Sequence, residues 1–136
     1  MNMPSTEKKR VLVIDDEKYI VDLLYEYLSP IGYDVETATN GDEAKIKIVA
    51  HKFDAIICDI KMPGVSGMEL YEYVTERHPD MANRVIFITG DSMATETSKF
   101  LKTFTVKYIR KPFNLSEIDE TIKNITGGDE RCNIVE

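Results

Sequence analysis

The chain has 136 residues, 43% of them hydrophobic, and a formal net charge of -7 at pH 7. This length and composition are typical of one globular domain with a buried core. The acidic balance argues against a direct nucleic-acid partner, because phosphate binding depends on clustered Lys and Arg. We expect residues 1–9 to be a lead-in, residues 10–126 one folded domain, and residues 127–136 a flexible polar tail.

The apolar runs are far shorter than a membrane span, and the polar first seven residues lack the apolar core of a signal peptide. We therefore expect a cytoplasmic protein with no membrane partner. The two cysteines do not suggest a disulfide framework, because Cys58 falls in a predicted buried strand and Cys132 in the polar tail. Both are expected to be free thiols.

The first predicted strand is the apolar run Val11–Ile14, which ends in the acidic triplet Asp15-Asp16-Glu17. Apolar residues then recur at the spacing of a helix until Pro30 and Gly32 stop the pattern. They are Ile20, Leu23, Leu24, Tyr27, Leu28 and Ile31. Residues 33–38 read as a second, weaker strand.

A second helix is expected after Asn40, whose side chain is suited to cap it. Its buried residues are predicted to be Ala44, Ile48 and Val49. The apolar run 55–58 is too short for an independent helix and reads as a strand buried on both faces. That strand ends at Asp59 and is followed by a loop.

The third helix is predicted to begin after Ser66, because Ser66 and Glu69 have the spacing of a capping box, and to run to about Arg77. The fourth strand spans 85–88 and is followed by a helix over 92–102. A short fifth strand spans 106–109. The last helix begins at a second predicted capping box, from Asn114 to Glu117, and buries Ile118, Ile122 and Ile125.

Strands and helices therefore alternate five times. This alternation predicts an α/β domain with a parallel sheet and helices on both faces. The strands leave polar residues at their carboxyl ends, and in a parallel sheet these ends meet at one edge. The residues are Asp15, Asp16, Asp59, Thr89 and Lys111.

These residue types suit phosphoryl transfer. Clustered carboxylates repel one another, so they require a cation or a raised pKa, and oxygen ligands favour a hard ion such as Mg²⁺. Asp59 is the candidate nucleophile, because a carboxylate can form an aspartyl phosphate. Lys111 and the metal would stabilise the charge on the transferring oxygens, and Thr89 would hydrogen-bond another of them.

Four motifs in this order resemble the signature of the CheY-like receiver domains of response regulators, from about residue 10 to residue 125. They are Asp15-Asp16, Asp59–Gly67, Thr89-Gly90 and Tyr108–Phe113. The resemblance implies a flavodoxin-like (βα)5 three-layer sandwich whose five-stranded parallel sheet has the order 2-1-3-4-5. It also implies a phosphorelay module of a two-component system.

The resemblance implies a role for each matching residue. Asp59 would accept a phosphoryl group from a sensor histidine kinase or a histidine phosphotransfer protein, and Thr89 and Tyr108 would form a switch pair. A Mg²⁺ ion would be held by Asp15, Asp16, Asp59 and the backbone carbonyl of Lys61. Lys111, before a cis peptide bond to Pro112, would pair with the phosphoryl group, and Gly90 is the small residue that keeps this group reachable.

The output is expected to be contact with another protein through the fourth helix, fifth strand and fifth helix. One position departs from the family pattern, since Phe104-Thr105 stands where receivers usually carry Gly-Ala. The usual glycine helix stop is absent, which leaves the end of the fourth helix open. Lys61 and Asp91 either form an ion pair that shields the acyl phosphate or remain two solvated loop charges.

Two other functions compete with this reading. One is a Mg²⁺-dependent phosphatase or phosphotransferase of the haloacid-dehalogenase type, which also uses an aspartate at a strand end. That family requires a second aspartate two residues after the nucleophile, where this chain has Lys61. The other is a receiver that binds constitutively without phosphorylation, against which the intact set of site residues argues.

Overall fold

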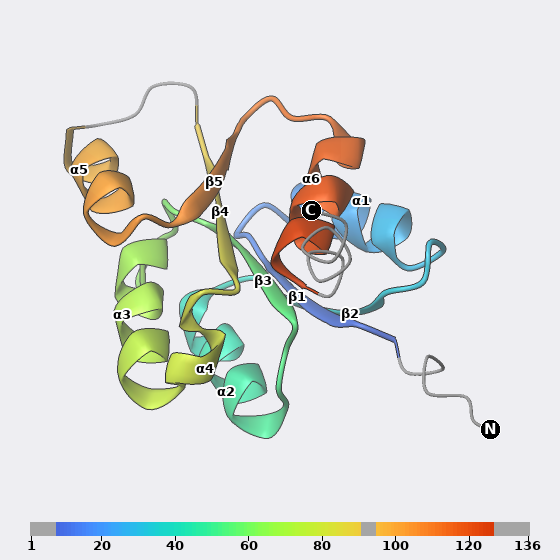
Figure 1. Ribbon diagram of the computed structural model, residues 1–136, viewed down its shortest axis with the longest axis horizontal. Helices are drawn as coiled ribbons and strands as arrows, with labels where there is room; N and C mark the ends of the chain where they lie inside the picture. The colour runs from blue at the N-terminus through green and yellow to red at the C-terminus, as the bar shows by residue number, and fades with distance from the viewer. Residues whose placement is uncertain (1–7, 91–94, 127–136) are drawn as a thin grey trace, which may run out of the picture.

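The computed structural model describes residues 8–90 and 95–126. In these residues strands and helices alternate along the chain, except that two helices, α3 and α4, follow each other between β3 and β4 (Figure 1). The strands are β1 (Arg10–Ile14), β2 (Asp34–Ala38), β3 (Ala55–Asp59), β4 (Val85–Thr89) and β5 (Lys107–Arg110). The helices are α1 (Lys18–Leu28), α2 (Gly41–Ala50), α3 (Gly67–Arg77), α4 (Pro79–Ala82), α5 (Thr95–Phe104) and α6 (Leu115–Ile125). Most of the predicted lead-in, the whole predicted tail and Cys132 lie outside the described residues.

The five strands form one parallel sheet in the order β2-β1-β3-β4-β5, as predicted. The register pairs Ile14 with Cys58 and Asp59 with Ile88. It also pairs Thr89 with Arg110. The carboxyl ends of β1, β3, β4 and β5 therefore lie at one edge of the sheet, which positions the polar residues that follow them.

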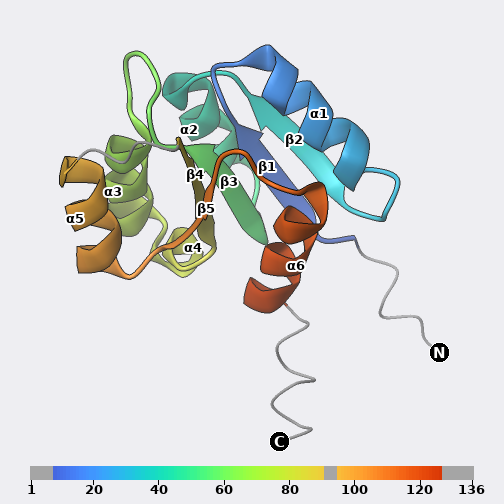
Figure 2. The ribbon, with the colours of Figure 1, turned by 90° about the horizontal axis from the view of Figure 1, so that it is seen from above.

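Helices cover both faces of the sheet (Figure 2). On one face α1 and α6 bury Leu24, Leu28, Ile118 and Ile122 against alternate strand residues. On the other face α2, α3, α4 and α5 pack against the remaining strand residues. All residues of β3 and β4 are buried, since these central strands have helices on both sides. The central strands therefore provide a rigid base for the residues at their ends.

Two of the three predicted helix caps are confirmed. The Asn40 side chain accepts a hydrogen bond from the backbone N–H of Glu43. Ser66 and Glu69 form the complete capping box at the start of α3. The prediction for Asn114 is wrong, because its side chain makes no capping hydrogen bond although it precedes α6 with extended backbone. At the start of α6 the backbone N–H of Glu117 instead donates a hydrogen bond to the backbone carbonyl of Asn114.

The structure corrects three details of the helices. α3 ends at Arg77 as predicted, but a short helix that was not predicted, α4, begins at Pro79, so the predicted fourth and fifth helices are α5 and α6. α1 ends at Leu28, and Ile31 lies outside the helix and is exposed. Val49 was predicted to be buried but is exposed on α2. None of the helices in the described ranges is long and apolar enough to cross a membrane.

The end of α5 shows how the chain manages without the usual glycine. The helix runs to Phe104, and Thr105 follows with a φ of 54°, in the left-handed region. The ring of Phe104 packs against Tyr71 and Phe100, at centroid distances of 5.7 and 5.2 Å. A β-branched threonine therefore occupies the conformation that glycine adopts most easily at a helix end.

Candidate functional site

Three carboxylates come together at the carboxyl edge of the sheet, as the strand ends predict. Asp15 and Asp16 follow β1, and Asp59 is the last residue of β3. One oxygen from each lies within 4.8 Å of the others, which is the geometry of a group that can hold a metal ion. The sequence prediction that these acids share a site is therefore confirmed as geometry.

Asp15 is the most buried member of this cluster. Its Oδ1 accepts a hydrogen bond of 2.9 Å from the backbone N–H of Glu17, which fixes the side chain. Its Oδ2 accepts no hydrogen bond from any residue that the structure describes. Burial raises the pKa of Asp15 and the neighbouring charges of Asp16 and Glu17 add to it, while the Glu17 N–H and Lys111 act in the opposite direction.

Asp59 is also buried, and burial is the largest cause that raises its pKa to about 7. The charge of Asp15 raises this pKa further, while Lys111 lowers it. The backbone N–H of Lys61 also favours the charged form of Asp59 through a hydrogen bond. Asp59 is thus a carboxyl group whose charge requires a nearby cation.

The cluster fits a hard divalent cation. Its ligand atoms are all carboxylate oxygens, and no described residue donates a hydrogen bond to the buried Oδ2 of Asp15. Mg²⁺ is bound by one or two carboxylates together with waters and phosphate oxygens. A cation here would offset the burial and the repulsion that raise the pKa values of Asp15 and Asp59.

The loop after β3 is held in place by a close contact with α3. Gly67 donates a backbone hydrogen bond of 2.8 Å to the carbonyl of Ile60. A Cβ at Gly67 would lie 2.6 Å from the carbonyl oxygen of Asp59 and 2.8 Å from the Cα of Ile60. Only glycine fits at this approach, so Gly67 sets the path of the chain directly after Asp59.

Thr89 and Gly90 end the neighbouring strand β4. Thr89 is buried, and its hydroxyl donates a hydrogen bond of 3.4 Å to the carbonyl of Gly90. A Cβ at Gly90 would meet no atom of the described residues within 4 Å, so none of these residues fills the space beside it. The buried hydroxyl and Gly90 lie at the same sheet edge as Asp59.

Lys111 approaches the acids from the end of β5, and its peptide bond to Pro112 is cis, as the resemblance implied. Its ammonium lies 3.7 Å from Oδ2 of Asp15 and 3.6 Å from Oε1 of Glu17. Among the described residues it forms ion pairs with these two acids and none with Asp59. The structure therefore brings Lys111 to the predicted site but places it at the side of β1.

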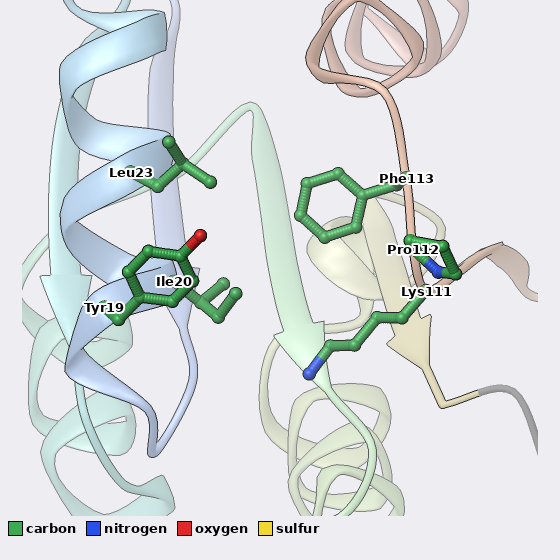
Figure 3. A pocket seen from close by; sticks show the side chains of 6 residues that line it. All are labelled: Tyr19, Ile20, Leu23, Lys111, Pro112 and Phe113. Atoms are coloured by element: carbon green, nitrogen blue, oxygen red, sulfur yellow. The ribbon is translucent and has the colours of Figure 1, made fainter.

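A groove of about 420 Å³ adjoins Lys111 (Figure 3). One wall is the first half of α1, and the other is the segment that follows β5. The lining residues are Tyr19, Ile20, Leu23, Lys111, Pro112 and Phe113. The Phe113 ring points toward Leu23, and the Lys111 side chain extends below that ring toward the α1 side of the groove (Figure 3). A mainly apolar groove therefore leads to Lys111, the one charged residue among the described residues that line it.

The remaining predicted residues lie as follows. Tyr108 is 44% exposed on β5 and is in register with Phe87, two positions before the carboxyl end at which Thr89 lies. Lys61 is exposed in the loop after Asp59. Asp91 lies outside the described residues, so its pairing with Lys61 stays a prediction. The role of the Lys61 carbonyl as a metal ligand also stays a prediction.

Sequence reasoning missed the contact between Glu17 and Lys111. Glu17 was visible as the third acid after β1, but its spacing from Lys111 in the sequence carries no signal. Only the parallel order of the sheet, together with the turn of the chain before α1, brings the two side chains together.

Comparisons with known proteins agree with this geometry. A family model described as the response regulator receiver domain matches residues 11–123. The transcriptional regulatory protein ResD of Bacillus subtilis is 33% identical over 121 residues, which are 89% of this chain and 49% of ResD. The chain thus spans about half the length of the curated relatives it matches.

Solved structures show the same similarity. A CheY-like receiver domain protein from Methanospirillum hungatei is 34% identical, with a TM-score of 0.79 over 87% of this chain and 93% of that chain. The response regulator TrrA from Thermotoga maritima, solved in complex with Mg²⁺-BeF, is 36% identical. Its TM-score is 0.73, over 86% of this chain and 98% of TrrA. The chain therefore belongs to the response regulator receiver domain family.

Proposed function

We propose that Asp59 accepts a phosphoryl group from a sensor histidine kinase or a histidine phosphotransfer protein in a Mg²⁺-dependent reaction. The observation that carries this proposal is the meeting of Asp59 with two further carboxylates at an edge that also holds Lys111. A nucleophilic carboxylate, a cation site and an ammonium are the groups that phosphoryl transfer to a carboxylate requires. We also propose that residues 10–126 form the receiver domain.

In the proposed reaction an Oδ of Asp59 attacks phosphorus, and the bond between phosphorus and the donor's imidazole nitrogen breaks. The donor keeps the electron pair of that bond, and the chain gains an acyl phosphate. Bound Mg²⁺, held by Asp15, Asp16, Asp59 and the Lys61 carbonyl, would neutralise charge on the phosphoryl oxygens. Lys111 would pair with a second oxygen, and the hydroxyl of Thr89 would donate to a third.

The donor's imidazole must reach a buried carboxylate past the rim of the site. Gly90 supports access, because it has no side chain and no described residue lies within 4 Å of the position that its Cβ would take. The apolar groove between α1 and Phe113 adjoins the same rim and fits an apolar ridge on the donor protein. We propose this groove as the region where the phosphodonor protein docks.

The signal would leave the domain through α5, β5 and α6. Thr89 would move toward the phosphoryl group, and the ring of Tyr108, now 44% exposed, would turn inward behind it. Phosphorylation would thus shift an equilibrium between two arrangements of this face, which a target protein reads. The domain would catalyse only its own phosphorylation and dephosphorylation and turn over no external substrate.

The haloacid-dehalogenase alternative has no support in the comparisons, which match the chain to receiver domains. The chain also lacks the second aspartate of that family, since Lys61 stands two residues after Asp59. A receiver that binds constitutively would not need the acids, the threonine and the lysine that are all present at the sheet edge.

The test is intact mass spectrometry after incubation with Mg²⁺ and a small acyl phosphate. We expect one labile phosphoryl adduct on the wild-type protein and none on Asp59→Asn. Asp54→Asn is a suitable control, because Asp54 precedes the same strand at its far end and binds the backbone N–H of Arg10. Multiple turnover of a phosphomonoester, or an adduct that survives in Asp59→Asn, would contradict the proposal.

The ion pair between Lys61 and Asp91 is proposed as a shield over the acyl phosphate that lengthens its lifetime. Lys61→Ala is then expected to lose phosphate faster than the wild type. The measurement is the decay of the adduct at constant Mg²⁺ concentration, and an unchanged decay rate would leave Lys61 as a solvated loop charge.

A further inference from the structure

Lys111 stands between two carboxylates, neither of which is the proposed phosphoacceptor. Its ammonium lies 3.7 Å from Asp15 and 3.6 Å from Glu17. The two acids differ in freedom, because the Asp15 side chain is buried and fixed by a hydrogen bond, whereas the Glu17 side chain is 62% exposed. Within the part of the chain that the structure describes, Lys111 forms ion pairs with these two acids alone.

The proposed function requires Lys111 to move. In that function its ammonium pairs with a phosphoryl oxygen on Asp59, so it must leave its present partners. A metal ion bound by Asp15 would take up the charge of that carboxylate. Glu17 would then be the remaining acid in contact with Lys111.

We propose that Glu17 is a positioning residue that competes with the phosphoryl group for Lys111. Its carboxylate holds the ammonium at the side of β1 and releases it when the group on Asp59 provides a stronger partner. No bond to Glu17 is made or broken, since the step is an exchange of ion-pair partners. This inference rests on the proposed function and gives Glu17 a role in setting how tightly the phosphoryl group is held.

The exposure of the two side chains to water sets how strongly Glu17 competes for Lys111. The Lys111 side chain is 25% exposed and that of Glu17 is 62% exposed, so water screens the pair. Such pairs change an equilibrium by roughly two- to five-fold. Glu17 therefore tunes the affinity for a phosphoryl group and does not decide whether one binds.

The probe is beryllofluoride, a phosphoryl mimic, at saturating Mg²⁺. We expect Glu17→Gln to bind it about two- to five-fold more tightly than the wild type, the range that an exposed ion pair supports. Glu17→Asp retains the charge and is expected to restore most of the wild-type affinity. Asp22→Asn removes one negative charge from α1, the helix that Glu17 precedes, and is expected to leave the affinity unchanged, because Asp22 pairs with Lys18.

A second readout does not depend on the bound ligand. In metal-free protein the ¹³Cε resonance of Lys111, assigned by its loss in Lys111→Ala, is expected to shift in Glu17→Gln and to stay in place in Asp22→Asn. Such a shift reports directly that Glu17 contacts the ammonium.

The outcomes separate this inference from the proposed function. If the wild type binds beryllofluoride and Glu17→Gln binds it equally or more weakly, the inference is wrong and the proposed function stands. An equal gain in beryllofluoride affinity in Asp22→Asn would also contradict the role of Glu17, because the effect would then come from the change in net charge. A wild-type protein that binds no beryllofluoride would overturn both.

Discussion

Oδ2 of Asp15 lies 3.7 Å from the ammonium of Lys111 and accepts no hydrogen bond within the described residues. A buried carboxylate oxygen in this situation costs free energy, because burial removes water and nothing fully replaces it. The cost is tolerated where a cation completes the site. The buried oxygen of Asp15 therefore supports a metal ion and a phosphoryl group binding at this acidic edge of the sheet.

Magnesium is expected to stabilise the fold. At a concentration of ten times its dissociation constant, Mg²⁺ should raise the free energy of unfolding by about 1.4 kcal/mol, since it binds the folded chain alone. Asp16→Asn should lose most of this gain, because Asp16 supplies one of the three carboxylates. Urea titrations of both proteins with and without Mg²⁺ measure the gain in the free energy of unfolding. An equal gain in wild type and Asp16→Asn would place the ion elsewhere.

The stability of the metal-free protein is expected to fall between about pH 4 and pH 7. The pKa of Asp59 is raised from 3.8 to about 7 in the folded chain, so the folded state holds a proton that the unfolded state has already released. The contribution of Asp59 to the free energy of unfolding is fully present below the pKa of the unfolded state. It is lost as the pH rises through the pKa of the folded state. Asp15, whose pKa is also raised, acts in the same direction.

Asp59→Asn isolates this effect. At pH 8 in a chelating buffer the variant should be more stable than the wild type by roughly 1–3 kcal/mol, because it removes a buried charge. At pH 4 the difference should shrink toward zero. Denaturant unfolding of both proteins at pH 8 and pH 4 measures the two differences. A wild type that is more stable than Asp59→Asn at pH 8 would contradict a raised pKa at Asp59.

Gly67→Ala tests the close approach beneath Asp59. The added methyl would overlap the carbonyl oxygen of Asp59 and the Cα of Ile60, so we expect a loss of about 1–3 kcal/mol in the free energy of unfolding. Gly90→Ala is the matched control, because its Cβ would meet no described residue within 4 Å. Similar losses in both variants would show that the contact at Gly67 is not the cause.

Thr105→Gly is expected to stabilise the chain. The left-handed conformation raises the free energy of the folded chain by about 1–2 kcal/mol for a residue with a side chain. Glycine avoids this strain but loses roughly 0.5–1 kcal/mol more backbone entropy on folding. The net gain should be about 0.5–1 kcal/mol. Thr103→Gly, at an exposed position inside α5, should instead lose stability. Thermal unfolding of both variants gives the comparison, and a destabilised Thr105→Gly would argue against strain at this position.

The resemblance to receiver domains implied the sheet order. The residues themselves predicted the meeting of Asp15, Asp16 and Asp59, because a parallel sheet brings all carboxyl strand ends to one edge. Local capping chemistry was equally reliable at Asn40 and Ser66, where a side chain and an N–H three residues on are neighbours in any helix. These features depend on short spacings or on topology alone.

Other features depend on contacts that no spacing reports. Val49 has the helical spacing of a buried residue, but the orientation of α2 against the sheet exposes it. Pro79 stops α3 and begins α4, and a proline supports either reading. The left-handed Thr105 and the pair of Lys111 with Glu17 both arise from tertiary packing.

The central claim is that Asp59 itself is phosphorylated. An acyl phosphate is reduced by borohydride to an alcohol, so a phosphorylated aspartate becomes homoserine, and peptide mass spectrometry locates it. After incubation with Mg²⁺ and an acyl phosphate donor, the account predicts homoserine at position 59 and no conversion of Asp15 or Asp16. Homoserine at either of those positions, or an adduct with no conversion at position 59, would contradict it.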